Sequence, residues 1–232
     1  MVFGCESEAT VCLAKLTVSK DDVKAFCDTC VLLRSLWRHY QTLFEGSNLK
    51  RQLLQSIAPT FFGDIHALFV RHLVLEICKI TDPVGTMGRT NLTVKFLIEY
   101  SDFSSAPNTL DRLKRLSDSM HAFRDKIVPA RNRFIAHLDR ESVQLGLSLG
   151  GASQEDWLQF WLDLQDFLHI MDKHYVNRNG NFYLNGIAQL SDAEMVLKAL
   201  KESTYFQTLL DRNETTRQAS DAAFGSKFFD AN

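Results

Sequence analysis

Residues 124–140, Arg-Asp-Lys-Ile-Val-Pro-Ala-Arg-Asn-Arg-Phe-Ile-Ala-His-Leu-Asp-Arg, carry the pattern from which the fold can be inferred. Apolar residues recur through this stretch, and through the residues before it, at steps of three and four, which is the spacing of one helix face. The pattern predicts a long amphipathic helix that begins near Leu110. Its apolar face consists of Leu113, Leu116, Met120, Phe123, Ile127, Phe134 and Leu138.

Pro129 interrupts this predicted helix. Proline has no N–H group to donate to the carbonyl of Asp125, and its ring crowds the preceding turn. We therefore expect a bend just before Arg131. On an ideal helix Arg131 and His137 are about 120° apart, on either side of Phe134.

The rest of the chain shows the same helical periodicity between turn-forming residues. Ser19 with Asp22 is a helix-start signature, Ser153 is a second one, and Thr90 or Asn91 is expected to cap the helix that follows it. The further helices that we expect cover about 20–45, 49–57, 60–80, 92–100, 157–175 and 192–212.

The sequence therefore predicts an all-α fold. Residues 60–80 are apolar on nearly every side, which indicates a central, largely buried helix, and residues 82–89 are expected to form a loop. By domain, we expect an arm at 1–18, a helical bundle at 19–176, a turn-rich hairpin with a final helix at 177–213, and a mobile tail at 214–232.

Composition limits the class of protein. The chain has 232 residues, 45% hydrophobic and 23% charged, which is enough to build a substantial core. No apolar run is long enough to span a membrane and no leader is evident, so we expect a cytoplasmic protein. Cys27 and Cys30 have no matching second pair, so we expect buried helix thiols, no metal site and no cofactor.

The net charge of −2 argues against an electrostatic nucleic-acid binder as a whole. The charge is unevenly distributed, because the segment from Arg112 to Arg140 holds eight Lys or Arg and three Asp. This segment predicts either a surface that contacts an anionic partner or a solvated helix face.

The spacing of Arg131 and His137 does not by itself identify a functional site, since a similar spacing also joins Arg34 to His39 and Arg115 to His121. Only Arg131 is followed by a carboxamide, Asn132, and preceded by a bend. Residues 131–137, Arg-Asn-Arg-Phe-Ile-Ala-His, resemble the arginine, polar residue, four variable positions, histidine motif of the HEPN superfamily of small helical ribonucleases. Residues 79–83, Lys-Ile-Thr-Asp-Pro, and 91–93, Asn-Leu-Thr, are similar to its abortive-infection, AbiU-like branch.

The resemblance implies a HEPN-like helical bundle with a long kinked motif helix and a C-terminal helical extension. It also implies a homodimer whose facing motif helices form a metal-independent endoribonuclease, acting in cellular defence or as a toxin, that leaves 2′,3′-cyclic phosphate and 5′-hydroxyl ends. In this scheme His137 is the general acid or base, Arg131 clamps the phosphate and Asn132 holds the geometry. The RNA backbone contacts implied are Arg124, Lys126, Arg133 and Arg140.

Other functions stay open at this point. A non-catalytic HEPN module would bind RNA, a nucleotide or a protein, and an antitoxin or other regulatory protein is a further conceivable partner. An interaction protein would use the aromatic helices 157–175 and 192–212. Asp139 stands where many HEPN toxins have a tyrosine, which speaks against control by nucleotidylation. The plainest alternative is an Arg131 that only pairs with an acidic neighbour.

Overall fold

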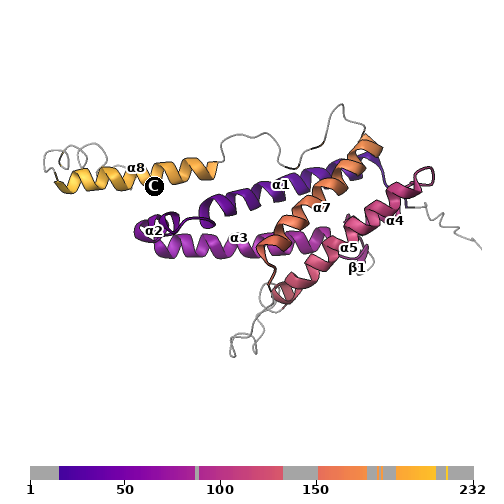
Figure 1. Cartoon of the computed structure of the whole chain (residues 1–232), viewed down its shortest axis with the longest axis horizontal. Coiled ribbons are helices and arrows are strands. Elements are labelled where there is room, and N and C mark those ends of the chain that lie inside the picture. Colours follow the sequence, from indigo (N-terminus) through magenta and orange to yellow (C-terminus); the bar gives the residue numbers. More distant parts are fainter. Residues whose placement is uncertain are drawn as a thin grey trace, which may run out of the picture. The chain divides into compact units, whose positions relative to one another are not determined.

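The computed structural model describes residues 16–86, 89–132, 151–176, 182, 184, 192–212 and 218. Most of this part of the chain is helical, so the predicted all-α class is confirmed (Figure 1). The regions predicted as an N-terminal arm, a hairpin after residue 176 and a C-terminal tail lie almost wholly outside the described residues. The helices are α1 (Lys20–Phe44), α2 (Asn48–Ile57), α3 (Pro59–Ile80), α4 (Val94–Glu99), α5 (Pro107–Ala130), α7 (Gln154–Met171), the π-helix η2 (Asp172–Val176) and α8 (Asp192–Arg212).

Two helices begin at the predicted capping residues. At the start of α1, the Asp22 backbone N–H donates to Ser19 Oγ at 3.1 Å and the Ser19 N–H donates back to Asp22 Oδ2 at 2.8 Å. At the start of α7, Ser153 and Asp156 make the same reciprocal pair, at 3.2 and 2.8 Å. Each box satisfies N–H groups that a helix start leaves without a carbonyl partner.

The segment between α3 and α4 is more ordered than the predicted loop. Strands β1 (Gly85–Thr86) and β2 (Arg89–Thr90) pair antiparallel, with Gly85 opposite Thr90. The Asn91 backbone N–H donates to the Val84 carbonyl at 2.6 Å, and its side-chain amide donates to the Pro83 carbonyl at 3.1 Å. The two strands pair residues that are close together in the sequence. The hairpin is therefore a local feature, and the fold remains all-α.

The predicted cap of α4 was wrong by two or three residues. Thr93, not Thr90 or Asn91, caps this helix, because its Oγ1 accepts the Phe96 backbone N–H at 3.2 Å. The Asn91 side chain is engaged by the hairpin instead. Local capping rules could not distinguish these candidates, since all three are good N-cap residue types.

The chain divides into two compact units built from interleaved segments. The first unit comprises Met1–Cys27, Lys79–Arg124 and Ala152–Phe182, and the second comprises Asp28–Cys78, Asp125–Gly151 and Tyr183–Asn232.

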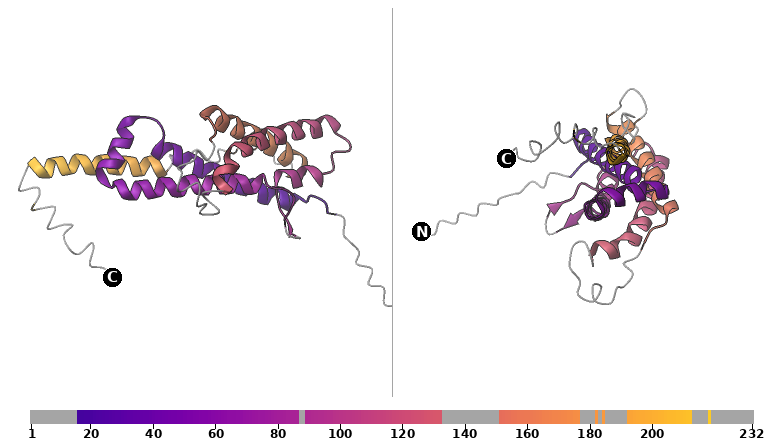
Figure 2. Two further views of the ribbon diagram at one scale, coloured as in Figure 1. Left: turned by 90° about the horizontal axis from the view of Figure 1, so that it is seen from below. Right: turned by 90° about the vertical axis from the view of Figure 1, so that its left-hand side faces the viewer.

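The core of the first unit lies between α5 and α7, which run against one another in both sets of views (Figures 1 and 2). The Phe123 ring stacks on Phe160 at 4.7 Å and meets Trp157 edge-on at 4.9 Å. Phe26 of α1 meets Phe167 at 6.5 Å. Aromatic pairs in these geometries add to the stabilisation from buried apolar area. Other fully buried side chains here are Val23, Leu97, Leu113, Met120, Leu164, Leu168 and Met171.

In the second unit, aromatic rings of α1 and α3 form a cluster. The Phe44 ring lies 6.2 Å from Phe69 and 5.1 Å from the His66 ring. Tyr40 Oη lies 3.4 Å from His66 Nε2. His66 therefore packs within this aromatic cluster. Helix α8 packs on α2.

Helix α3 is less buried than predicted. Phe61 and Leu68 expose 58% and 59% of their surface, and burial is confined to the second half of the helix. Glu76, the acidic residue within this apolar segment, is half-buried. The all-round apolar pattern could not predict this exposure, because burial depends on which neighbouring elements reach each face. The buried residues of α3 are Leu73, Val74, Ile77, Cys78 and Ile80.

The cysteines are confirmed as buried thiols where the structure describes them. Cys27, Cys30 and Cys78 are thiols that form no disulfide, and all three are fully buried. They behave as small apolar residues of the helix cores.

Candidate functional site

Arg131 and Asn132 directly follow the regular part of α5. The α-helix ends at Ala130, with Pro129 in its last turn, and the next two residues continue as a π-helical turn. This change occurs where the missing N–H of Pro129 was expected to disturb the helix. Arg131 is half-buried and Asn132 is exposed.

A hydrogen bond joins these two candidate residues. Arg131 Nη1 donates to Asn132 Oδ1 at 3.2 Å. The carboxamide thereby restrains the guanidinium, which has five N–H groups in a fixed planar arrangement. The role of Asn132 in holding the geometry of a site stays a prediction. The other candidates in the motif, Arg133, His137 and Arg140, lie outside the described residues.

Arg124 takes part in an ion pair. Its Nη2 donates to Asp82 Oδ1 at 2.7 Å, and the two side chains are only 18% and 19% exposed. A charge-assisted hydrogen bond of this length in a partly buried position is a strong structural contact. Arg124 therefore has a role in the fold that does not depend on RNA. Lys126, two positions later, is exposed.

The ion pair joins the two sequence segments that carry the family resemblance. Asp82 belongs to residues 79–83, and Arg124 opens the stretch 124–140. Asn91 and Thr93, from the other part of the resemblance, close the β-hairpin and cap α4. Asp82 ties this region to α5, whereas Asn91 and Thr93 make local contacts between residues 83 and 96, so each of these upstream polar residues has a structural contact.

A family model described as AbiU2, of the HEPN type, matches residues 20–208. The chain belongs to the AbiU2 family. The match spans α1 to most of α8 and includes the stretch from Arg131 to His137. Comparison with curated proteins and with solved structures gave no match. The family assignment identifies this AbiU2 chain as an abortive-infection HEPN module, as the sequence motifs had indicated.

An arginine of α1 in this AbiU2 chain has a lowered pKa that was not predicted from sequence. Burial, with a contribution from the charge of Arg38, lowers the pKa of Arg34 to about 10. The two arginines are one turn apart on α1 and belong to the second unit, as Arg131 does. Strongly shifted groups are common at functional sites but also occur in structural clusters. In the sequence, this site shows only as two arginines four positions apart, next to Leu33 and Trp37. The structure shows that Leu33 and Trp37 are buried.

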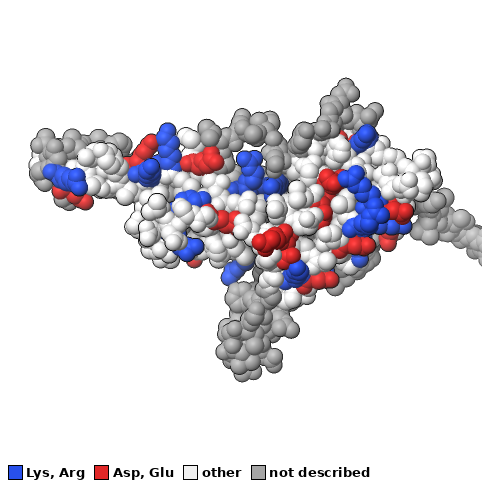
Figure 3. Space-filling view, viewed as in Figure 1, with Lys and Arg blue, Asp and Glu red and all other residues white. Residues whose placement is uncertain are grey.

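The predicted basic character of residues 112–140 is partly balanced within the first unit of the AbiU2 chain. Arg112 Nη2 donates to Asp166 Oδ2 at 2.6 Å, as Arg124 does to Asp82. On the face drawn in Figure 3, basic and acidic side chains lie next to one another among the described residues. These two ion pairs engage two of the basic side chains of residues 112–140 in contacts within the protein.

Neither a cluster of metal ligands nor a membrane-spanning helix is found in the described ranges of the AbiU2 chain. No group of three or more His, Cys, Asp or Glu side chains there is arranged to hold a metal ion. None of the helices in that part of the chain combines the length and the apolar character of a membrane span.

Proposed function

We propose that the chain is a metal-independent endoribonuclease of the HEPN type that acts as a homodimer in cellular defence or as a toxin. Membership of the AbiU2 family, over a range that includes Arg131 and His137, is the observation that carries the proposal. The hydrogen bond from Arg131 to Asn132 supports it, because a phosphate clamp needs an oriented guanidinium.

The proposed reaction is an internal transesterification. One imidazole takes the proton of the ribose 2′-hydroxyl, and the 2′-oxygen attacks the adjacent phosphorus. The bond from phosphorus to the 5′-oxygen breaks, and a protonated imidazole gives its proton to that oxygen. The products are a 2′,3′-cyclic phosphate and a 5′-hydroxyl. Arg131 neutralises the charge that builds on the phosphate oxygens.

A homodimer would provide the two proton-transfer groups that this reaction requires. One histidine serves one proton transfer at a time, and the reaction needs both a base and an acid. Two subunits that bring their motif segments together supply two copies of His137 and two of Arg131 around one two-fold axis. Lys126, Arg133 and Arg140 are the proposed contacts to the RNA backbone. Arg124 is a weaker candidate, because Asp82 already engages it.

The test is cleavage of a defined single-stranded RNA by the purified full chain in excess EDTA. We expect cleavage that persists in EDTA and yields ends that polynucleotide kinase can label at the 5′-hydroxyl without prior phosphatase. His137→Ala and Arg131→Ala are expected to lower the rate at least about a hundredfold, as loss of a general acid–base or charge-stabilising group does. Their circular dichroism and melting temperature should match those of the wild type.

The chain supplies a matched control for this experiment. Arg115 and His121 have the same six-residue spacing as Arg131 and His137, but they lie within α5, where Arg115 is exposed. Arg115→Ala is expected to cleave RNA at the wild-type rate. RNA that is bound but not cleaved by the wild type would replace the proposal with a non-catalytic RNA-binding module.

A further inference from the structure

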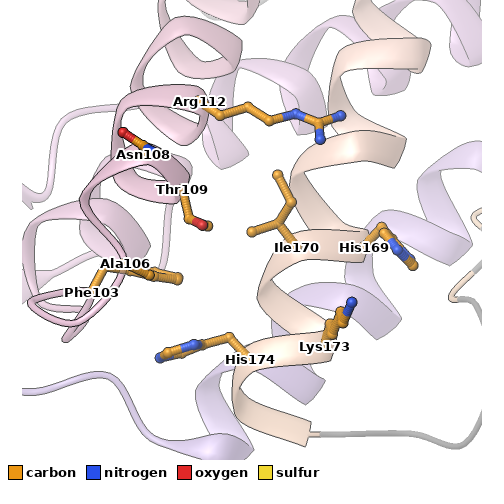
Figure 4. Close-up of a pocket in the computed structure, with 9 residues that line it drawn as sticks. All are labelled: Phe103, Ala106, Asn108, Thr109, Arg112, His169, Ile170, Lys173 and His174. Carbon is orange, nitrogen blue, oxygen red and sulfur yellow. The ribbon is translucent and has the colours of Figure 1, made fainter.

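A pocket of about 690 Å³ lies in the first unit, between the start of α5 and the end of α7 with η2 (Figure 4). Its volume falls within the range of small-molecule sites. It is formed by other residues than the Arg131 motif: the α5 residues that line it precede Arg131 by about twenty positions in the sequence. The proposed nuclease reaction makes no use of it.

Nitrogen-bearing side chains surround this pocket. Arg112 comes from α5, His169 from α7, and Lys173 and His174 from η2. None of the nine residues that line the pocket, all in the described part of the chain, is acidic. The N-terminal end of the α5 dipole adds a weak preference for negative charge. The lining therefore favours an anion.

An ion pair places the arginine at the pocket. Arg112 Nη2 donates to Asp166 Oδ2 at 2.6 Å, which ties α5 to α7. Figure 4 shows the Arg112 side chain extending from α5 toward α7, above Ile170. A guanidinium has five N–H groups, so it can bind a phosphate beside the carboxylate that orients it. Asp166 itself does not line the pocket.

The other side of the pocket is held by contacts between η2 and the loop before α5. His174 Nε2 lies 3.0 Å from the Asp102 carbonyl oxygen, which can only accept, so this ring nitrogen donates. The Asp102 backbone N–H donates to Tyr175 Oη at 3.0 Å, and the His174 ring lies 4.2 Å from the ring of Phe103.

The π-helical turn is what presents consecutive side chains to this loop. π-helical turns are rare and are frequently found at functional sites. Here η2 brings Lys173 to the pocket and turns His174 and Tyr175 to contacts with Asp102 and Phe103. The pocket is thus largely formed before a ligand binds, which lowers the entropic cost of binding.

We propose that this pocket binds a small organic phosphate. Arg112 and Lys173 hold the phosphate, and the non-ionic part of the ligand lies against Ile170 and Ala106, which are half-buried apolar side chains of the lining. An inorganic ion alone would leave this apolar surface uncovered. A wholly apolar molecule would leave the cations without a counter-charge.

Calorimetric titration of the full chain with phenyl phosphate, inorganic phosphate and phenol, at constant ionic strength, tests this proposal. Phenyl phosphate is expected to bind. Inorganic phosphate lacks the apolar ring and should bind about tenfold more weakly, and phenol lacks the phosphate and should not bind measurably. Lys173→Ala and Arg112→Ala should each weaken phenyl phosphate binding about tenfold or more. Arg115→Ala, on the same helix but outside the lining, should bind as the wild type does.

Two results would overturn the proposal. One is a failure of phenyl phosphate to bind through Lys173. This would be seen if its affinity were unmeasurable, or if the wild type and Lys173→Ala, with equal melting temperatures, bound it with equal affinity. The other is dependence on Lys173 for a ten-nucleotide RNA but not for phenyl phosphate, which would make this face a contact for the RNA backbone. Neither readout requires cleavage, so each result is independent of the proposed nuclease.

Discussion

At the scale of single residues, the contact with Asp82 gives Arg124 a structural role that is distinct from the role in RNA binding expected of it. The side chains are less than one-fifth exposed and their charged atoms lie 2.7 Å apart. Removing the arginine takes a charge-assisted hydrogen bond from a carboxylate in a partly desolvated position. We expect Arg124→Ala to lower the free energy of unfolding by about 1.5–3 kcal/mol, the usual range for hydrogen bonds to charged groups.

A double-mutant cycle with Asp82→Ala measures this coupling by urea unfolding. The double variant should be destabilised by less than the sum of the single variants, because each removes the same contact. Lys126→Ala, at an exposed position two residues later, is the control and should change stability by less than about 0.5 kcal/mol. Additive effects would show that the ion pair does not stabilise the fold.

The sequence could predict residues whose roles are local, and it could not predict this pair. Ser19, Asp22 and Ser153 were identified as helix starts because their partners lie three positions away. Asp82 lies 42 positions from Arg124, so nothing in the local pattern distinguished the arginine from its exposed neighbours. The Arg131 to Asn132 contact joins adjacent residues, but the role expected of Asn132 came from the family resemblance and not from a local pattern.

At the scale of elements, Pro129 determines where α5 stops being regular. The helix ends at Ala130 and Arg131 starts a π-helical turn. Pro129→Ala restores an N–H that can donate to the carbonyl of Asp125. We expect the α-helix to continue through Arg131, the free energy of unfolding to rise by up to about 3 kcal/mol, and RNA cleavage to fall because the guanidinium is rotated out of place.

Pro107 provides the matched control for this substitution. It is the first residue of the same helix, where a missing N–H removes no intrahelical bond. Pro107→Ala should change neither cleavage nor, beyond about 0.5 kcal/mol, stability. A Pro129→Ala variant that is more stable and equally active would show that the end of α5 is not part of the catalytic geometry.

Element boundaries were the most predictable part of this fold, and burial was the least. The expected helix 20–45 is observed as Lys20–Phe44, and 192–212 as Asp192–Arg212. The periodic pattern gives the face of a helix, but not whether another element covers that face. The predicted burial of α3 failed for this reason, since Phe61 and Leu68 belong to an apolar segment that remains exposed.

At the scale of the whole molecule, the proposed active site belongs to two subunits. If both copies of His137 act in one cleft, a dimer with one His137→Ala subunit is inactive. Co-expressing wild-type and His137→Ala chains in equal amounts should therefore leave about one quarter of the wild-type activity per total chain, because only dimers of two wild-type subunits cleave RNA. A subunit that acts alone would leave about half.

The measurement needs subunits that have exchanged fully, which differential tags and sequential affinity purification can establish. The isolated mixed dimer gives the sharper comparison, since its activity should be near zero in the shared-site scheme. Activity of the mixed dimer at half the wild-type level would contradict that scheme.

The exposed half of α3 has a consequence for handling the protein. Phe61 and Leu68 present more than half of their surface to solvent, and salts that are excluded from protein surfaces make such exposure more costly. The chain should therefore be retained on a phenyl column at moderate ammonium sulfate concentrations and precipitate early in salt fractionation. Replacing both residues by serine should bring elution forward while leaving the melting temperature unchanged, since neither side chain contributes to the core.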